Sequence, residues 1–231
     1  MPRASRAAVE PERPQAAPYG GEEARNHLLR ADPVLGKLMR RVGPFTLSPD
    51  RPAHPFQSLA TSILYQQLNG KAASTIVRRF VEAHGLRGRF PRPEQVAAAK
   101  PQALRACGIS FNKGRALQDL ARRTLEGEVP PFRALERMED GAIVEQLTRI
   151  RGVGPWTVEM LLIFRMGRQD VLPVTDFGVR KGFSLAFERS QLPSPRELSE
   201  HGERWRPYRT MASWYLWRAT DLAAGAGETW P

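Results

Sequence analysis

The 231-residue sequence predicts an all-α fold, and three observations point to it. Apolar residues recur at i, i+3 and i+4 along most of the chain, the spacing that places them on one face of a helix. The period-two alternation typical of strands is nearly absent after the first fifty or so residues. Proline and glycine stand where helices begin and end, and they divide the chain into about ten helices joined by short turns.

The chain divides into a tail and one folded domain. Residues 1–21 are rich in Pro, Ala, Arg and Glu and end on two glycines. Such a composition cannot bury enough apolar surface to fold, so we expect a disordered tail. The folded domain is expected to span residues 22–231.

Each expected helix has a local reason. Residues 55–68 are the clearest amphipathic segment, and Asn69-Gly70 is a typical helix end. Asn112 is a suitable N-cap for the helix that follows it. The segment 155–166 is apolar nearly all round, which indicates a central, buried helix. The expected helices are 22–42 (interrupted at Asp32-Pro33), 55–68, 71–84, 101–107, 113–125, 139–150, 155–166, 177–187, 195–201 and 207–224.

Composition excludes several classes of protein. The formal net charge is +11 and the pI is about 10.7, and the first 25 residues contribute no net charge, so the folded body is basic and a polyanionic partner is favoured. Cys107 is the only cysteine, which excludes an intrachain disulfide and a four-cysteine iron–sulfur cluster. The four histidines lack zinc-ligand spacing. No apolar run is long enough to span a membrane, so we expect a cytoplasmic protein, nucleoid-associated if bacterial, with no membrane partner. We also expect it to be a monomer.

A Gly-Val-Gly turn at residues 152–154 lies between two apolar-periodic segments. Gly152 and Gly154 allow a turn that side chains would block and let the backbone approach a ligand closely. The free N–H groups at the start of the next helix form an anion site, to which Thr157 can add a hydroxyl. Val153 is expected to fill the gap between the helices. The alternative is an ordinary corner in which the glycines serve packing alone.

A carboxylate follows this turn. Asp176 comes just after the sequence Leu172-Pro173-Val174-Thr175 and just before an expected helix. It is also a good N-cap, and the two roles are compatible. Asp170 and Glu159 are weaker candidates, because Asp170 precedes the Leu-Pro break and Glu159 lies inside the expected buried helix.

These motifs resemble the helix–hairpin–helix (HhH-GPD) superfamily of base-excision DNA glycosylases. Gly152-Val153-Gly154 is similar to the family's hairpin turn, and residues 172–176 are similar to its loop and catalytic Asp. The resemblance runs from about Phe56 to Trp217 and places the hairpin at residues 139–167. It implies two helical lobes with the active site in the cleft between them. It also implies that Asp176 stabilises the oxocarbenium-like sugar and orients the attacking water.

Two further matches indicate the branch. Trp156 occupies the position at which strand-cutting members carry a Schiff-base lysine, so we expect no lyase activity. Gly-Pro-Trp-Thr and the stretch at residues 205–217 resemble the alkyladenine branch, the 3-methyladenine DNA glycosylase II type. The chain is too short before Pro55 for the extra N-terminal domain of the larger bacterial enzyme, so a compact form is expected.

The resemblance assigns roles to single residues. Trp217 is expected to stack on the flipped base, with Trp156, Met160 and Tyr65 lining the same pocket. A positively charged base over an indole face gains about 0.5–2 kcal/mol and is already a good leaving group. Met160 stands where a tyrosine can occur, which leaves the range of lesions open.

Other expected roles concern the DNA. Gln67 is the expected wedge that fills the gap left by the base, with Leu68 as the second choice. Lys113 is expected on a phosphate. Hairpin carbonyls near Arg149 to Gly154 are a possible Na⁺ or K⁺ site, and no cofactor is required.

The sequence therefore predicts a monofunctional DNA glycosylase of base excision repair. Its expected partner is double-stranded DNA that contains alkylated purines of the 3-methyladenine or 7-methylguanine type. Two alternatives stay open: a glycosylase for oxidised or mismatched bases, and a non-catalytic helix–hairpin–helix module that only binds DNA.

Overall fold

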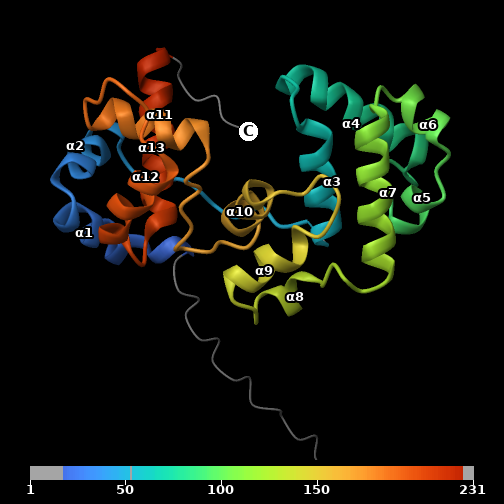
Figure 1. The fold of residues 1–231 in the computed structure, drawn as a ribbon, viewed down its shortest axis with the longest axis horizontal. Coiled ribbons are helices and arrows are strands. Elements are labelled where there is room, and N and C mark those ends of the chain that lie inside the picture. The colour runs from blue at the N-terminus through green and yellow to red at the C-terminus, as the bar shows by residue number, and fades with distance from the viewer. Residues whose placement is uncertain (1–17, 53, 226–231) are drawn as a thin grey trace, which may run out of the picture.

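The computed structural model describes residues 18–52 and 54–225 and is all-helical over those ranges, as predicted (Figure 1). The described residues form thirteen α-helices and two short 3₁₀ helices, with no strand. In chain order these are η1 Pro18–Gly20, α1 Gly21–Ala31, α2 Pro33–Val42, α3 Pro55–Tyr65, α4 Gly70–His84, α5 Pro93–Ala97, α6 Pro101–Ala106, α7 Phe111–Leu125, α8 Phe132–Leu135, α9 Asp140–Leu147, α10 Pro155–Phe164, α11 Phe177–Ala186, α12 Pro195–Gly202, η2 Glu203–Trp205 and α13 Arg209–Ala224.

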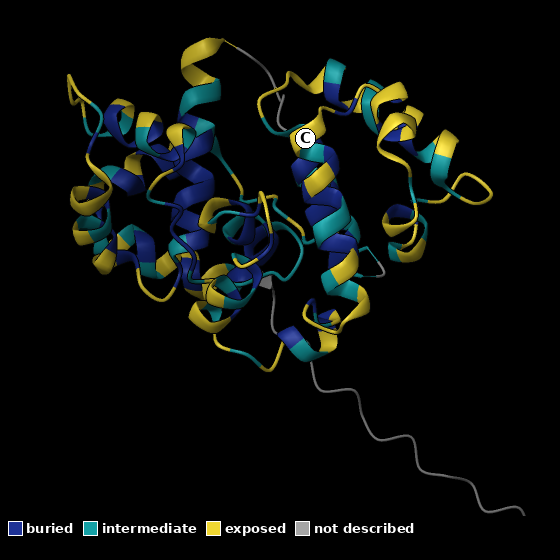
Figure 2. Ribbon diagram, turned by 45° about the vertical axis from the view of Figure 1, so that its right-hand side comes forward, coloured by how far each residue is buried: buried dark blue, intermediate teal, exposed yellow. Residues whose placement is uncertain are grey.

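The helices form two groups, as the two-lobed prediction requires. One group, on the left of Figure 1, contains α1, α2 and α11 to α13, so both ends of the described chain contribute to it. The other group contains α3 to α7, and α8 to α10 lie between the two. Buried residues face the interior of each group, and exposed residues cover its outer side (Figure 2).

Close helix packing shapes the first group. α11 and α13 approach so closely that a Cβ added at Gly182 would lie 1.8 Å from the carbonyl oxygen of Leu216. Most of α13 is buried, although its sequence shows little one-sided amphipathic character. A helix surrounded on all sides needs no polar face, and α13 is the centre of this group.

Helix starts follow the expected local chemistry. Asp32 separates α1 from α2 and accepts hydrogen bonds from the backbone N–H groups of Val34 and Leu35, each at 3.1 Å. Pro33 stands at the first position of α2, where a missing N–H costs nothing. One predicted cap is wrong: Ser110, not Asn112, caps α7, because α7 begins at Phe111.

The predicted tail boundary is also wrong at its last residues. Tyr19 is 2% exposed, and its hydroxyl donates a 2.6 Å hydrogen bond to the carbonyl of Ile163 on α10. Residues 18–21 therefore belong to the fold, while the expectation for residues 1–17 lies outside the described residues. No helix in the described part of the chain is long and apolar enough to cross a membrane.

Candidate active site

Asp176 is held by three hydrogen-bond donors at the start of α11. Its Oδ1 accepts from the backbone N–H of Val179 at 2.8 Å and from Nε1 of Trp217 at 2.9 Å. Its Oδ2 accepts from Nε1 of Trp156 at 2.7 Å. The carboxylate is both a helix N-cap and the acceptor of two indole N–H groups, so its orientation is fixed from α10, α11 and α13.

This arrangement leaves limited acceptor capacity on the carboxylate. An ionised carboxylate has about four lone-pair sites, two on each oxygen. Both sites on Oδ1 of Asp176 are used, whereas Oδ2 accepts one described hydrogen bond. By this count one acceptor position is left on Oδ2, and the side chain is only 7% exposed.

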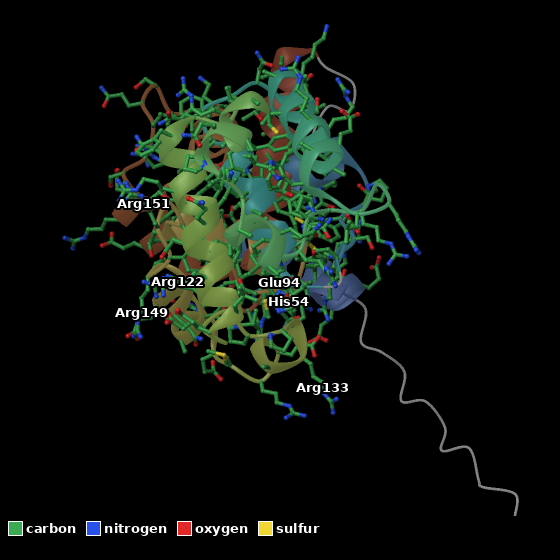
Figure 3. All side chains as sticks on the ribbon, turned by 90° about the vertical axis from the view of Figure 1, so that its right-hand side faces the viewer. His54, Glu94, Arg122, Arg133, Arg149 and Arg151 are labelled. Atoms are coloured by element: carbon green, nitrogen blue, oxygen red, sulfur yellow. The ribbon has the colours of Figure 1, made fainter. Side chains whose placement is uncertain are left out.

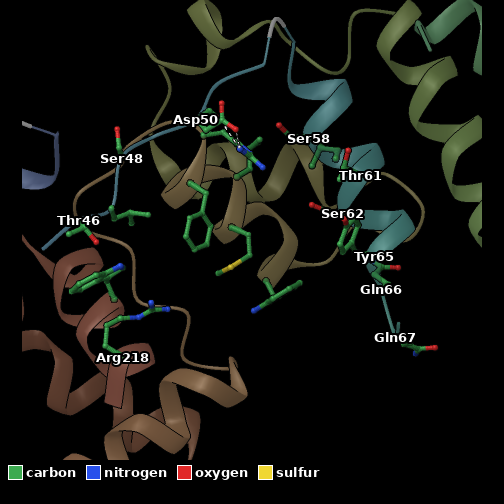
Figure 4. Close-up of a pocket in the computed structure, with 18 residues that line it drawn as sticks. Thr46, Ser48, Asp50, Ser58, Thr61, Ser62, Tyr65, Gln66, Gln67 and Arg218 are labelled. Carbon is green, nitrogen blue, oxygen red and sulfur yellow. Dashed lines mark hydrogen bonds and ion pairs between the residues drawn. The ribbon is translucent and has the colours of Figure 1, made fainter. Parts of the chain in front are cut away.

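A cavity of about 1000 Å³ opens between the two helix groups (Figure 4). Trp156 lines it and is 39% exposed, so one indole both faces the cavity and bonds to Asp176. The other lining residues come from the segment before α3, from α3 itself, and from α10 and α13. They are Thr46, Leu47, Ser48, Asp50, Ser58, Leu59, Thr61, Ser62, Tyr65, Gln66, Gln67, Met160, Leu161, Phe164, Arg165, Trp214 and Arg218.

The expected pocket residues are only partly brought together. Trp156, Met160 and Tyr65 line the cavity. Trp217 does not: it is 3% exposed, stacks on Phe164 with ring centroids 5.6 Å apart, and donates to Asp176. The structure therefore places the Trp217 indole behind the cavity wall, where it donates to the carboxylate, and not in the cavity lining where a base would meet it.

Two aromatic residues of the cavity were missed at the sequence level. Phe164 and Trp214 both line it. Trp214 precedes Trp217 by three positions on α13, so helical spacing placed both on neighbouring faces without deciding which one reaches the cavity. The guanidinium of Arg218 lies 5.5 Å from the Trp214 ring centroid and pairs with Asp221 at 2.9 Å, which puts a fixed cation at this end of the cavity.

The hairpin consists of α9, a tight turn and α10. Gly152 has φ +77°, a conformation that favours glycine, whereas Gly154 has φ −100° and open space where a Cβ would be. Neither backbone conformation nor packing within the protein therefore requires glycine at position 154. Val153 is 4% exposed, as a residue filling the space between the helices should be. Thr157 is 3% exposed, so its expected contact with a phosphate has little surface to work from.

The structure gives Lys113 a different role from the phosphate contact that the sequence suggested. Its Nζ donates to the carbonyls of Leu64 at 2.8 Å and Gln66 at 2.7 Å, and burial lowers its pKa below the usual 10.5. The expected wedge residues follow directly: Gln67 is exposed with φ +57°, and Leu68 is 39% exposed. Lys113 thus binds the chain just before the wedge instead of facing solvent.

A second carboxyl group, that of Glu159, is influenced by the charge of Asp176. Burial, followed by the charge of Asp176, raises the pKa of Glu159 to about 7. Its Oε2 is buried and has no hydrogen-bond partner among the described residues. Glu159 does not line the cavity. Asp176 is linked to the cavity by its hydrogen bond with Trp156, whose indole lines it. Asp170 is engaged by Arg206 and Arg209 away from this site.

The chain belongs to the HhH-GPD superfamily of base excision DNA repair proteins, whose family model matches residues 60–207. It is 36% identical over 204 residues to DNA-3-methyladenine glycosylase 1 of Schizosaccharomyces pombe, covering 87% of this chain and 88% of the relative.

Solved structures agree with this assignment. The fold matches the 3-methyladenine DNA glycosylase Mag1 of Schizosaccharomyces pombe in complex with abasic DNA, with a TM-score of 0.80 and 34% identity over 89% of this chain and all of the other. It also matches a DNA-3-methyladenine glycosidase from Bacillus halodurans, with a TM-score of 0.78 and 35% identity over 88% of this chain and 92% of the other.

Proposed function

We propose that this protein is a monofunctional DNA glycosylase that removes alkylated purines, of the 3-methyladenine or 7-methylguanine type, from double-stranded DNA. The observation that carries the proposal is the placement of Asp176: a nearly buried carboxylate, fixed by two indole N–H groups, directly behind the wall of a cavity with aromatic lining. The relatives named above, with their 3-methyladenine substrates, support the same class of lesion.

The chemistry assigned to Asp176 is electrostatic. As the bond between the sugar and the base breaks, positive charge develops on the sugar, and a preorganised carboxylate stabilises it. The free acceptor position on Oδ2 serves the sugar or orients the attacking water. Because three donors already fix the carboxylate, it needs no reorganisation when the charge appears.

The base is accommodated by the cavity between α3, α10 and α13. Trp156, Tyr65 and Phe164 offer aromatic surface for a cationic purine, which is also a good leaving group. Extruding a base from a duplex costs a few kcal/mol, and less when the base is damaged or poorly paired. Gln67, exposed at the cavity edge, fills the gap that the base leaves.

The protein releases bases without cutting the strand, because position 156 holds an indole and not an amine. The hairpin would hold a Na⁺ or K⁺ ion. Carbonyls near Arg149 to Gly154 would hold such an ion; those of Arg149 and Arg151 are available, because no described residue donates a hydrogen bond to them. When bound, the ion supplies positive charge facing the phosphate. We place the protein, as a monomer, in the compartment that holds the DNA: the cytoplasm, and the nucleoid if the chain is bacterial.

Incubation with methylated duplex DNA followed by alkali tests the proposal. Release of the methylated base, with strand breaks that appear only after alkali, is the expected result for the wild-type protein. Asp176→Asn should bind the duplex and release no base. A protein that binds duplexes without releasing any base would be a binding module, and preferential release from oxidised or mismatched duplexes would assign it to another class of glycosylase.

The ion is tested separately. Affinity for an undamaged duplex in KCl or NaCl should exceed the affinity in the same concentration of a bulky tetraalkylammonium chloride. Equal affinities in the two salts would refute the proposed ion.

A further inference from the structure

The chain that carries the wedge is held by residues outside it. We call residues 66–69 the wedge loop. Lys113 of α7 donates to the carbonyls of Leu64 and Gln66 at the entry to this loop. Gln66 in turn donates from Nε2 to the carbonyl of Gly152 in the hairpin at 2.8 Å. Gln67, next in the chain, has φ +57°, which a residue with a side chain adopts only where its surroundings enforce it.

The same helix also holds the hairpin. A Cβ added at Gly152 would lie 3.0 Å from the Cβ of Ala116, so the turn rests directly on α7. The backbone N–H of Arg151 donates to Oδ2 of Asp119 at 2.9 Å. Asp119 is itself paired with Arg122 and Arg123 of α7, which keeps its carboxylate in place. The arginines around this contact are visible at the left of Figure 3.

Lys113, Ala116 and Asp119 are spaced three residues apart and therefore share one face of α7. They contact, in order, the wedge loop, the glycine of the hairpin turn and the residue before that glycine. A helix rises about 1.5 Å per residue, so the six residue steps from Lys113 to Asp119 span about 9 Å of a rigid element. α7 thus fixes the position of one DNA-facing segment relative to the other.

We propose that this face of α7, here called the α7 brace and defined by Lys113, Ala116 and Asp119, positions the wedge relative to the hairpin. The proposal rests on the proposed function, because it concerns base extrusion. When the hairpin grips a phosphate, the brace places Gln67 at a set distance along the same duplex. Lys113 is a positioning residue that does not touch DNA.

Lys113→Met tests the brace, because it keeps the aliphatic stem and removes both hydrogen bonds. The matched control is Lys100→Met, which alters an exposed lysine in the same helix group whose side chain makes no described hydrogen bond or ion pair. Affinity for an undamaged duplex is measured over a range of salt concentrations. Extrusion is followed by the fluorescence of 2-aminopurine in a weakly paired position, and base release by single-turnover kinetics on methylated DNA.

The brace predicts an unchanged salt slope for Lys113→Met, with extrusion and base release reduced about 10- to 100-fold, as expected when a reacting group is misplaced by about 1 Å. Lys113→Arg, which retains donors, should restore part of both. If Lys113 contacted a phosphate instead, the salt slope would fall by about one and affinity would drop for all sequences, which would overturn the proposal. Normal extrusion by a folded Lys113→Met protein would overturn it too.

Asp119→Leu provides a second variant in case Lys113→Met does not fold. It removes the acceptor of the Arg151 N–H while Lys113 and the wedge loop stay unchanged, so extrusion should also fall, and wild-type extrusion by the folded variant would overturn the proposal. The salt slope and the fluorescence signal need no methylated base. A wild-type protein that extrudes 2-aminopurine but releases no alkylated purine would therefore refute the proposed function, while the brace would still be decided by whether Lys113→Met extrudes less than the wild type.

Discussion

Replacing Trp217 with Phe tests the central assignment of the site. The phenyl ring retains apolar surface next to Phe164 but lacks the N–H that donates to Oδ1 of Asp176 at 2.9 Å. Asp176 is 7% exposed, so water replaces this donor poorly and the carboxylate is free to turn or be neutralised. A hydrogen bond to a charged group contributes about 1.5–3 kcal/mol, and about 1.4 kcal/mol corresponds to a tenfold change in rate. Single-turnover base release should therefore slow about 10- to 100-fold.

The chain offers a matched control for this change. Trp205 is also buried, and its Nε1 donates to Oδ2 of Asp32, another N-cap carboxylate, at 3.0 Å. Trp205→Phe should lower the melting temperature while the folded protein keeps its rate of base release. A Trp217→Phe protein that releases base at the wild-type rate, or whose loss of rate matches that of Trp205→Phe after correction for the folded fraction, would refute the role given to the indole.

Three further predictions concern packing and titration. Gly182→Ala should prevent folding or strongly lower the melting temperature, because its Cβ would meet the carbonyl of Leu216 at 1.8 Å. Gly154→Asp should melt like the wild type, because there is open space at its Cβ, and should lose affinity for every duplex. Equal losses of melting temperature in the two variants would contradict this contrast. Burial, and then the charge of Asp176, raises the pKa of Glu159 to about 7, and ionisation of such a group weakens the fold. Glu159→Gln should therefore melt above the wild type at about pH 8, with the gap closing as the pH falls toward the usual pKa of 4.5. For Asp32, burial opposes ionisation, but hydrogen bonds from a histidine, a backbone amide and an indole lower its pKa below the usual 3.8. Its contribution to stability is present above about pH 4 and is lost as the pH falls further, so the melting difference between wild type and Asp32→Asn should shrink in acid.

Local signals in the chain were sufficient for most of the helices. The break at Asp32-Pro33 and the start of α10 at Pro155 follow from proline geometry, which acts within a few residues. α5 and α8, with 5 and 4 residues, were missed because segments so short show no helical periodicity. α3 ends three residues earlier than the sequence predicts, and Lys113 of α7 takes up the carbonyls of Leu64 and Gln66 where it ends.

In the candidate site, too, some features follow from local sequence and others depend on tertiary contacts. Asp176 was identified from sequence because an N-cap and a proline-containing loop are local features, and the structure places its carboxylate where both indoles reach it. Local sequence could not predict which of the two tryptophans on α13 faces the cavity. Trp214 and Trp217 lie on one helix, and their different environments depend on how α13 packs against α10 and α11.

The sequence by itself determined that this is a helical protein with a glycine hairpin and a catalytic-type carboxylate, because periodicity, turns and caps depend on neighbouring residues. The tertiary structure alone decided the partners of the polar side chains. Lys113 meets carbonyls that precede it by 49 and 47 positions, and Trp217 meets a carboxylate 41 positions away. A buried donor must find an acceptor wherever the packed helices bring one, and no local pattern specifies where that acceptor comes from.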